Sequence, residues 1–453
     1  MKTLLVCVAV VSLLPCASLV YAAAQVPHGT ASQTPVDPEL ARYIAGIKAI
    51  DNHAHTVLPP PNDATDREFD ALPVDSMEPQ TDPLTLREDA PQLSAAWQAL
   101  WGFKGQAPLD ADGLKRLQAA RAVTKAREGA AYDKWVLDRT GIATQLSNRV
   151  AMGPGLERPR FAWVPYDDTL MFPLSNSALA ASTPDKAQFF PLEAKVMQRY
   201  LQAAGLQARP ATLDDYLARL LLPTLRAQKQ GGAIAIKFEA AYLRSFNFTA
   251  VTQADAARVY AKFAGGAVPD DASYKLLQDY LFRTLCMEAG KLGMAVHIHT
   301  GEGAGSYFSL AGINPMLLEP LFNDPALRRT TNFVMLHGSW PYVHEAGALL
   351  QKPNVYLDLS QQVVLFSPRL LSTWLREWLE LYPDKVLFGT DAYPYSPSMG
   401  WEELLWVANR NAREALGIAL TGMVRDGVVD MPRAKAIAEM VLRGNAAKLY
   451  KLQ

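Results

Sequence analysis

Short apolar runs alternate with longer amphipathic stretches along most of this chain. Eight of these runs have the length and the bounding turn residues of buried strands, and we expect strands at 47–52, 141–147, 160–164, 233–238, 294–298, 332–336, 355–359 and 386–389. Apolar positions at helical spacing lie between most of them, for example at 214–229, 254–263, 274–291 and 368–381. Eight strands that alternate with helices are typical of an α/β fold, and the pattern predicts a TIM (β/α)8 barrel.

Two stretches are too long to be simple connections in such a barrel. Residues 57–130 are rich in Pro and Asp at first and then helical, and residues 171–213 are mostly helical. Long segments of this kind are commonly functional. We interpret both as insertions near the barrel mouth that form a lid or a substrate wall, within one barrel domain at 41–453.

The N-terminal residues have the features of a secretory signal peptide. Lys2 precedes an apolar run at 4–14, which is followed by Pro15 and by small residues up to Ala24. We therefore expect a signal peptide at 1–24, a flexible lead-in at 25–40, and export to the bacterial periplasm. The alternative is an N-terminal membrane anchor that is never cut.

Charge and cysteine content narrow the class of partner. The 453 residues carry 44 Lys and Arg against 45 Asp and Glu, so the formal net charge of −1 favours neither nucleic acid nor an anionic membrane. We expect a small-molecule substrate, no nucleic-acid partner, and no membrane contact after signal removal, and we leave a homo-oligomer open. Two of the three cysteines lie in the expected leader, which leaves Cys286 as a buried, inert thiol.

Histidine placement is the most informative feature of the chain. His53 and His55 follow the first apolar run, His299 closes the fifth, and His337 and Asp391 follow the sixth and eighth. The carboxyl ends of all strands of a barrel meet at one mouth, and residues i and i+2 of a strand share a face. Imidazoles and a carboxylate brought together in this way match the ligand set of Zn²⁺ or a similar divalent ion.

Lys237 ends the fourth apolar run, where an unpaired ammonium is costly to bury. Either carbamylation turns its amine into a carboxylate-like metal ligand, or the lysine pairs with Glu239 or with substrate. One layer below the site, we interpret His297 as a packing residue. Asp51 is a candidate to hold the second ring nitrogen of a ligand histidine.

The order of these residues resembles the amidohydrolase superfamily: His-x-His after strand one, Lys after strand four, His after strands five and six, and Asp after strand eight. The resemblance is closest to the branch that includes the N-terminal half of fungal FluG-type proteins. It rests on segments at 50–55, 236–244, 299–303, 337–342, 354–360, 388–391 and 442–446, which together span nearly all of the chain after the expected leader. The sequence departs from FluG-type patterns in its long 57–130 segment and in Glu302.

The resemblance implies a distorted TIM barrel that holds one or two divalent metals, with Zn as the expected ion. It implies that His53, His55, His299 and Asp391 are metal ligands. Lys237 and His337 would complete a second metal site or contact substrate. A bound metal lowers the pKa of water toward about 7, Asp391 would transfer its proton, and His337 would help to stabilise an oxyanion.

Tyr242 and Arg244 follow Lys237 closely, and we expect them to bind a polar or carboxylate group of the substrate, since an Arg fork suits a carboxylate. A structural ion pair is the alternative. The leading function is a metal-dependent hydrolase that acts on an amide-type C–N bond of a small polar substrate. The alternatives are decarboxylation or sugar-acid isomerisation on the same site, and an exported metal-binding protein without catalysis.

Overall fold

The computed structural model describes residues 36–452. The expected signal peptide at 1–24 and most of the lead-in lie outside the described residues. The last part of the expected lead-in is not flexible but helical: α1 (Pro38–Gly46) begins there because the Asp37 carboxylate caps it, accepting hydrogen bonds from the backbone N–H groups of Glu39 and Leu40 at 2.9 and 3.1 Å.

Eight parallel strands form the centre of the fold, each within a few residues of its predicted position. They are β1 (Ala49–Ala54), β2 (Ile142–Asn148), β3 (Phe161–Val164), β4 (Ala235–Phe238), β5 (Ala295–His299), β6 (Phe333–Leu336), β7 (Val355–Asp358) and β8 (Val386–Leu387). Hydrogen bonds join neighbouring strands into two sheets, with the orders β1-β2-β3 and β4-β5-β6-β7-β8. In both sheets each strand pairs with the next one along the chain. The strands are almost entirely buried, as expected of a parallel sheet covered by helices on its outer face.

Short backbone bridges join the two sheets at both seams. Parallel bridges between Trp163 and Ala233 and between Tyr166 and Lys237 connect the β3 end to β4. At the other seam the Asn52 N–H donates to the Phe388 carbonyl at 2.9 Å, and residue 54 bridges to residue 392 beyond β8. The eight strands therefore form the distorted TIM barrel that the sequence predicts.

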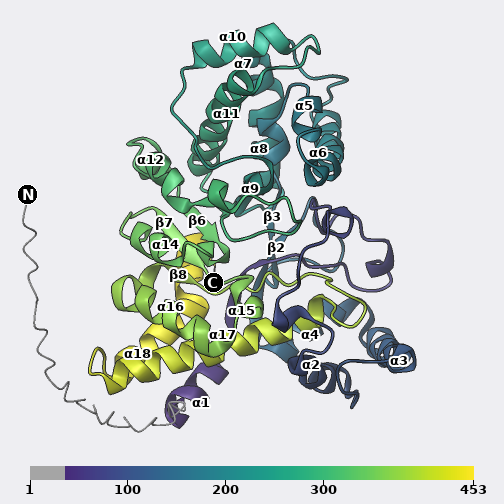
Figure 1. Ribbon diagram of the computed structural model, residues 1–453, viewed down its shortest axis with the longest axis vertical. Helices are drawn as coiled ribbons and strands as arrows, with labels where there is room; N and C mark the ends of the chain where they lie inside the picture. Colours follow the sequence, from purple (N-terminus) through teal and green to yellow (C-terminus); the bar gives the residue numbers. More distant parts are fainter. Residues whose placement is uncertain (1–35, 453) are drawn as a thin grey trace, which may run out of the picture. The chain divides into compact units, whose positions relative to one another are not determined.

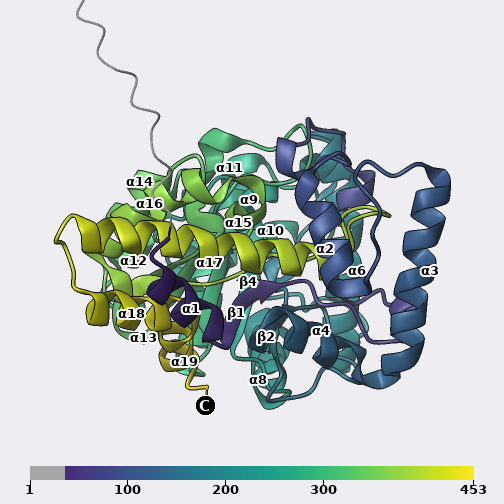
Figure 2. The same cartoon turned by 90° about the horizontal axis from the view of Figure 1, so that it is seen from below.

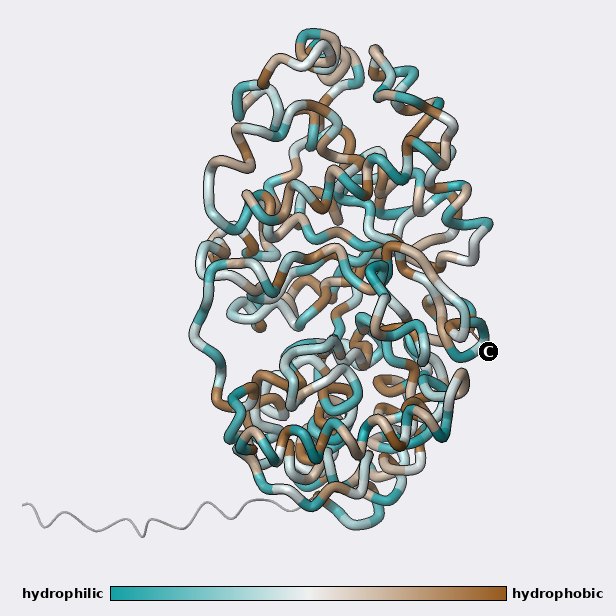
Figure 3. The backbone as a smooth tube through the Cα atoms, turned by 90° about the vertical axis from the view of Figure 1, so that its right-hand side faces the viewer, coloured by the Kyte–Doolittle hydropathy of each residue, from teal (hydrophilic) through white to brown (hydrophobic). Residues whose placement is uncertain are grey.

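Helices surround these strands (Figures 1 and 2). The predicted helical stretches are present as α7 (Leu213–Tyr216) with α8 (Leu222–Gln230), α10 (Gln253–Phe263), α11 (Asp271–Lys291) and α16 (Pro368–Leu381). The others are α9 (Ala240–Leu243), α12 (Glu319–Phe322), α13 (Leu327–Thr330), α14 (Val343–Leu349), α15 (Gln362–Leu365), α17 (Trp401–Arg425), α18 (Met431–Glu439) and α19 (Asn445–Tyr450). Hydrophobic and hydrophilic positions alternate along the helical turns of the chain in Figure 3, as in amphipathic helices.

The two long insertions occupy different places around the barrel. The first contains α2 (Pro91–Trp101) and α3 (Ala111–Glu128), is followed by α4 (Tyr132–Thr140), and packs through α2 against α17. The second contains α5 (Ser177–Ala180) and α6 (Pro184–Ala203), which lie near α7, α8 and α11 in Figure 1. Within residues 36–452, no helix combines the length and the apolar character required to cross a bilayer.

A buried ion pair fastens the first insertion to the barrel just beyond His55. The Arg149 guanidinium, fully buried after β2, binds both carboxylate oxygens of Asp66 at 2.8 and 2.9 Å and also reaches the backbone carbonyl of Thr56. Two parallel N–H···O bonds of this kind fix orientation as well as distance. The pair therefore sets where the chain turns away from β1 and the site.

We expect Asp66→Asn to lower the free energy of unfolding by about 3–5 kcal/mol, because it leaves the Arg149 charge buried without its counter-charge. Denaturant unfolding followed by tryptophan fluorescence measures the change. The control is Asp138→Asn, which breaks the pair with Arg160 at a position where the Asp side chain is 68% exposed. This control should cost less than about 1 kcal/mol. Equal losses in the two variants would contradict the assigned role.

Candidate metal centre

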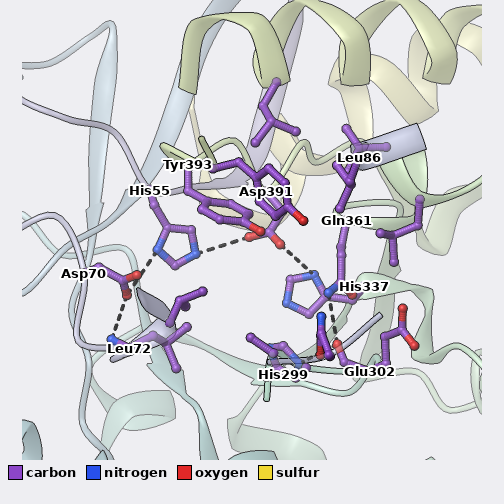
Figure 4. Close-up of a pocket in the computed structure, with 18 of the residues that line it drawn as sticks. His55, Asp70, Leu72, Leu86, His299, Glu302, His337, Gln361, Asp391 and Tyr393 are labelled. Carbon is purple, nitrogen blue, oxygen red and sulfur yellow. Dashed lines mark hydrogen bonds and ion pairs between the residues drawn. The ribbon is translucent and has the colours of Figure 1, made fainter. Parts of the chain in front are cut away.

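The barrel brings the sequence-predicted metal ligands together at one mouth (Figure 4). His53 lies in β1 and His55 just after it, His299 is the last residue of β5, His337 follows β6, and Asp391 follows β8. All five side chains are buried. Residues up to 338 positions apart in the sequence thus share one small volume, as the convergence of strand ends predicts.

Asp391 is the centre of this cluster. Its Oδ1 lies 3.1 Å from His53 Nε2 and 3.2 Å from His55 Nε2, and its Oδ2 lies 3.9 Å from His337 Nδ1. Ligand atoms of His53, His337 and Asp391 all lie within 4.8 Å of one another. The His299 ring is next to that of His337, with 4.3 Å between the ring centroids. These separations are those of side chains that can share coordination of one ion or of two neighbouring ions.

Unusual backbone geometry directs two of these side chains inward. His337 and Asp391 have φ angles of 66° and 57°, in the left-handed region that non-glycine residues seldom adopt. Each is held there by a backbone hydrogen bond: His337 N–H donates to Asp358 Oδ1 at 2.9 Å, and Asp391 N–H donates to the His53 carbonyl at 2.8 Å. Strain of this kind persists at sites where the surrounding contacts over-determine it.

Hydrogen-bond direction assigns the tautomer of His337. The Ser360 hydroxyl lies 2.6 Å from Asp358 Oδ1 and 2.9 Å from His337 Nδ1. Because a carboxylate only accepts, the Ser360 O–H donates to Asp358 and its oxygen accepts from Nδ1–H of His337. The other ring nitrogen, Nε2, is then left with a lone pair, which is the state that a metal ligand requires.

Burial keeps two of the imidazoles neutral. It lowers the pKa of His53 well below the ordinary value, and the charge of Lys237 adds to this. It does the same for His337, with His299 as the next cause. A histidine must be unprotonated to bind a metal, so both rings are prepared for that role.

Carboxylates reverse this effect at His55. Burial lowers the pKa of His55, but Asp70, whose Oδ1 lies 3.5 Å from His55 Nδ1, and Asp391 outweigh burial and raise it to about 10. Burial likewise raises the pKa of Asp391, but His337 and His55 outweigh it and hold that pKa at about 2. In the metal-free chain His55 and Asp391 thus form an ion pair, which a divalent cation would replace.

Lys237 and Glu239 form a second buried pair beside the histidines. Lys237 Nζ lies 2.5 Å from Glu239 Oε1, and Glu239 Oε2 lies 3.2 Å from His299 Nδ1. Burial raises the pKa of Glu239, but the charges of Lys237 and His299 outweigh it and hold the pKa below the ordinary value. Of the alternatives considered for Lys237, pairing with Glu239 is the one present in the structure.

Unpartnered buried atoms provide the test of whether a metal fits. Among the described residues, neither ring nitrogen of His53 has a hydrogen-bond partner, although the ring is fully buried. Buried polar atoms are nearly always satisfied, so such atoms need an explanation. Nitrogen and oxygen donors at this spacing suit a divalent transition ion. His53, His337 and Asp391 would hold it, with His55, His299 and Glu239 beside them.

A pocket of about 730 Å³, counting space open to solvent, leads from the surface to this cluster. The first insertion contributes Leu72, Val74, Pro83 and Leu86 to its wall, as predicted for a substrate wall. Residues 171–213, the second insertion, are not among the residues that line this pocket, and its role as a lid or wall stays a prediction. This insertion contacts the pocket wall through one ring pair: the Phe189 ring of α6 lies 5.6 Å from the Tyr242 ring, between centroids.

The two predicted substrate contacts separate in the structure. Tyr242, in α9, lines the pocket with its ring 4.9 Å from that of His299. Arg244 does not line it, and its predicted substrate contact is wrong. Its guanidinium binds Asp279 at 2.6 Å and lies 4.2 Å from the Phe248 ring centroid. The physical reason is that α9 turns the chain outward after β4, and the buried Asp279 captures the cation.

The structure also shows the contacts of three buried residues away from the cluster. Asp51 does not hold a ligand ring nitrogen: its carboxylate accepts from the Thr390 N–H and hydroxyl at 2.9 and 2.7 Å, which fixes the chain just before Asp391. His297 donates to or accepts from the Tyr450 hydroxyl at 2.7 Å and is a packing residue, as predicted. Cys286 is a buried free thiol, also as predicted.

Four residues of the site were not among the predicted ones: Glu239 as a possible ligand, Asp70, Gln361 and Tyr393. Glu239 and Tyr393 follow Lys237 and Asp391 by two positions, and the same-face rule for extended chain could have found them. Gln361 directly follows segment 354–360, one of the segments that resemble the amidohydrolase superfamily. Asp70 lies in an irregular loop of the first insertion, where the sequence gives no periodic signal.

Comparison with known proteins agrees with this geometry. Among solved structures, the fold is similar to a suggested metal-dependent hydrolase from Lactobacillus casei (TM-score 0.62, 18% identity, 91% of this chain and 97% of that one). It is also similar to uronate isomerase from Thermotoga maritima (TM-score 0.58, 12% identity, 79% and 78%) and to glucuronate isomerase from Caulobacter crescentus (0.57, 14%, 93% and 96%). Likeness at such identities shows a shared fold and not a shared reaction.

The sequence itself gives the family. Residues 171–452 match the sequence model of the family described as amidohydrolase, so the chain belongs to the amidohydrolase family, as the motif order predicts. Protein fluG of Emericella nidulans is 34% identical over 185 residues, which is 39% of this chain. The match spans only 20% of the fluG protein, about a fifth of its length.

Proposed function

We propose that this protein is a metal-dependent hydrolase of an amide-type C–N bond in a small substrate. The observation that carries the proposal is the position of Asp391, with one carboxylate oxygen 3.1–3.2 Å from two ligand histidines at the base of an open pocket. A carboxylate there is close enough both to the expected cation and to substrate to move a proton between water and a leaving group.

A divalent metal, when bound, would polarise the scissile carbonyl and lower the pKa of water. Asp391 would accept the proton of the attacking water on its carboxylate and donate it to the leaving nitrogen. His337 is best suited to be a ligand through Nε2, since its Nδ1–H is committed to Ser360. Donation from His337 to an oxyanion, which the resemblance implies, would need a proton on Nε2 that this tautomer does not have.

Two alternatives use the same residues. Decarboxylation and sugar-acid isomerisation act on anionic substrates, and among the described residues that line the pocket there is no Lys or Arg to receive a carboxylate. A metal-binding protein without catalysis would not need Asp391 held ionised beside an open pocket. We therefore favour hydrolysis. Zn as the ion, a carbamylated Lys237, and export to the periplasm remain proposals from sequence, and residues 1–24 lie outside the described part of the chain.

The proposal predicts metal-dependent release of an amine. Purified protein is incubated with dipeptides, N-acyl amino acids and amino-acid amides, and free amine is measured while bound metal is counted by mass spectrometry. We expect turnover of at least one class, abolition by a chelator, and recovery on addition of Zn²⁺. Metal-loaded protein that hydrolyses none of them, but decarboxylates or isomerises an acid, would contradict the proposal.

A further inference from the structure

The pocket wall combines negative charge with apolar surface. Besides histidines and tyrosines, the ionisable side chains among the described residues that line it are four carboxylates: Asp70, Glu239, Glu302 and Asp391. Glu239 and Asp391 are engaged by Lys237 and the histidines, and Asp70 accepts from the Tyr166 hydroxyl at 2.9 Å. Only Glu302 is left without a described hydrogen bond or ion pair to its carboxylate.

The Glu302 main chain is held by hydrogen bonds, which define the point from which its side chain projects. Its N–H donates to the Trp340 carbonyl at 3.1 Å, and its own carbonyl accepts from Gln361 Nε2 at 3.0 Å and lies 3.2 Å from His299 Nε2. Figure 4 shows Glu302 beside His299 and His337, on the side of the pocket away from His55 and Asp70. A half-buried carboxylate without a described partner thus lines the same pocket as the histidines and Asp391.

Part of the pocket wall is apolar. Leu72, Val74 and Leu86 of the first insertion line it, as do Val364 and Leu365 of α15 and Leu404 of α17. A surface of this kind favours an alkyl or aryl group, because removing such a group from water is favourable in proportion to the area buried.

Resting on the proposed function, we infer that the substrate is an amide with a cationic amino group and an apolar arm. The ammonium lies against the Glu302 carboxylate, and the arm packs on Leu72, Leu86 and Val364. Anionic substrates are disfavoured, since their carboxylate would share the pocket with Glu302 and would meet no Lys or Arg among the described lining residues. Lys237 is paired with Glu239, and Arg244 with Asp279. The inferred contact thus has the charges reversed: a carboxylate of the protein meets a cation of the substrate, where the sequence predicted that Arg244 would meet a substrate carboxylate.

A series of leucine p-nitroanilides that carry a different charge at the amino end tests the inference by kinetics, and its neutral and anionic members are matched in size. The substrates are leucine p-nitroanilide (cationic), N-butanoyl-leucine p-nitroanilide (neutral) and N-succinyl-leucine p-nitroanilide (anionic). We expect kcat/KM to fall by about tenfold or more at each step, the size of one charge interaction in a half-buried site. Preference for the anionic substrate would overturn the inference while leaving hydrolysis established.

Glu302→Gln identifies the residue responsible. It should remove the preference for the cationic substrate over the neutral one and leave turnover of the neutral substrate within a few-fold. The control is Glu88→Gln, which removes the same charge from an exposed position of the first insertion and should keep the preference. A preference that persists in Glu302→Gln would overturn the assignment to this side chain.

Binding tests the inference even if none of the anilides is turned over. Hexyltrimethylammonium and hexanesulfonate carry fixed opposite charges on the same chain. The ammonium has no lone pair to offer a metal, and the sulfonate is a weak metal ligand. Calorimetry on the metal-loaded protein should show the cation binding at least about tenfold more tightly, and Glu302→Gln should remove the difference. Tighter binding of the sulfonate, or no binding of either compound, would overturn it independently of any hydrolytic activity.

Discussion

The His53→Ala variant is expected to lose its divalent metal and its hydrolytic activity while keeping its fold. The His53 ring is buried and neutral, and its two nitrogens have no hydrogen-bond partner among the described residues. We therefore expect the ring to contribute to metal binding and little to the stability of the metal-free fold. Loss of residues that only support a ligand typically weakens metal binding 10–100-fold, and loss of a ligand itself should exceed about 100-fold.

Metal content by mass spectrometry, circular dichroism and a thermal melt separate loss of metal from loss of fold. The matched control is His344→Ala, which removes the same side chain from the surface, where it is 70% exposed and pairs with Glu377 at 2.7 Å. This control should keep its metal and its activity. A His53→Ala protein that retains wild-type metal content would show that the cluster is not the metal site.

The fold could be predicted because its signals are local. Each strand is a short apolar run between turn residues, and the closed order of neighbours follows from the rules for parallel strands. The ligand histidines could be found for the same reason, since each directly ends a strand. The bridges that close the barrel at residues 163–166 and 392 could not be predicted, because they are single contacts between segments that carry no strand pattern of their own.

The failures concern side chains beyond the strand ends. Arg244 lies only seven residues after Lys237, but the intervening α9 includes two alanines, which favour a helix, and it carries the arginine to Asp279, on α11. Asp70 reaches His55 from an irregular loop, held near the barrel by the Arg149–Asp66 pair. The position of Arg244 depends on its contact with Asp279, more than 30 positions away, and that of Asp70 on the Arg149–Asp66 pair, whose members are more than 80 positions apart. The spacing of residues along the chain does not encode such contacts.

The pocket wall shows how this bears on function. The residues expected to hold the metal come from strand ends, but much of the rest of the pocket wall comes from the first insertion, α15 and the loop after β5. Relatives can share the former and differ in the latter, since loops vary while the barrel is kept. The substrate must therefore be inferred from charge and shape in this chain, and not from the reactions of proteins that share its fold.

Asp391→Asn is expected to reduce kcat by about 10²–10⁴, the range of general acid–base catalysis, with metal retained by the histidines. The change is isosteric but removes the proton acceptor that lies 3.1–3.2 Å from His53 and His55. It also removes a charge that raises the pKa of His55, so the histidine will more readily take the neutral form that binds metal. Metal content must be measured beside kcat, because a loss of both would indicate a ligand role alone.

The dependence on the leaving group tests the proton-transfer role directly. A leaving alkylamine needs a proton to depart, whereas p-nitroaniline leaves with much less assistance. If Asp391 donates that proton, Asp391→Asn should reduce kcat for an alkylamide more than for the matched p-nitroanilide. Asp138→Asn, the same change at an exposed position, should leave both rates unchanged. Equal losses for the two substrates in a metal-loaded Asp391→Asn protein would show that Asp391 does not protonate the leaving nitrogen.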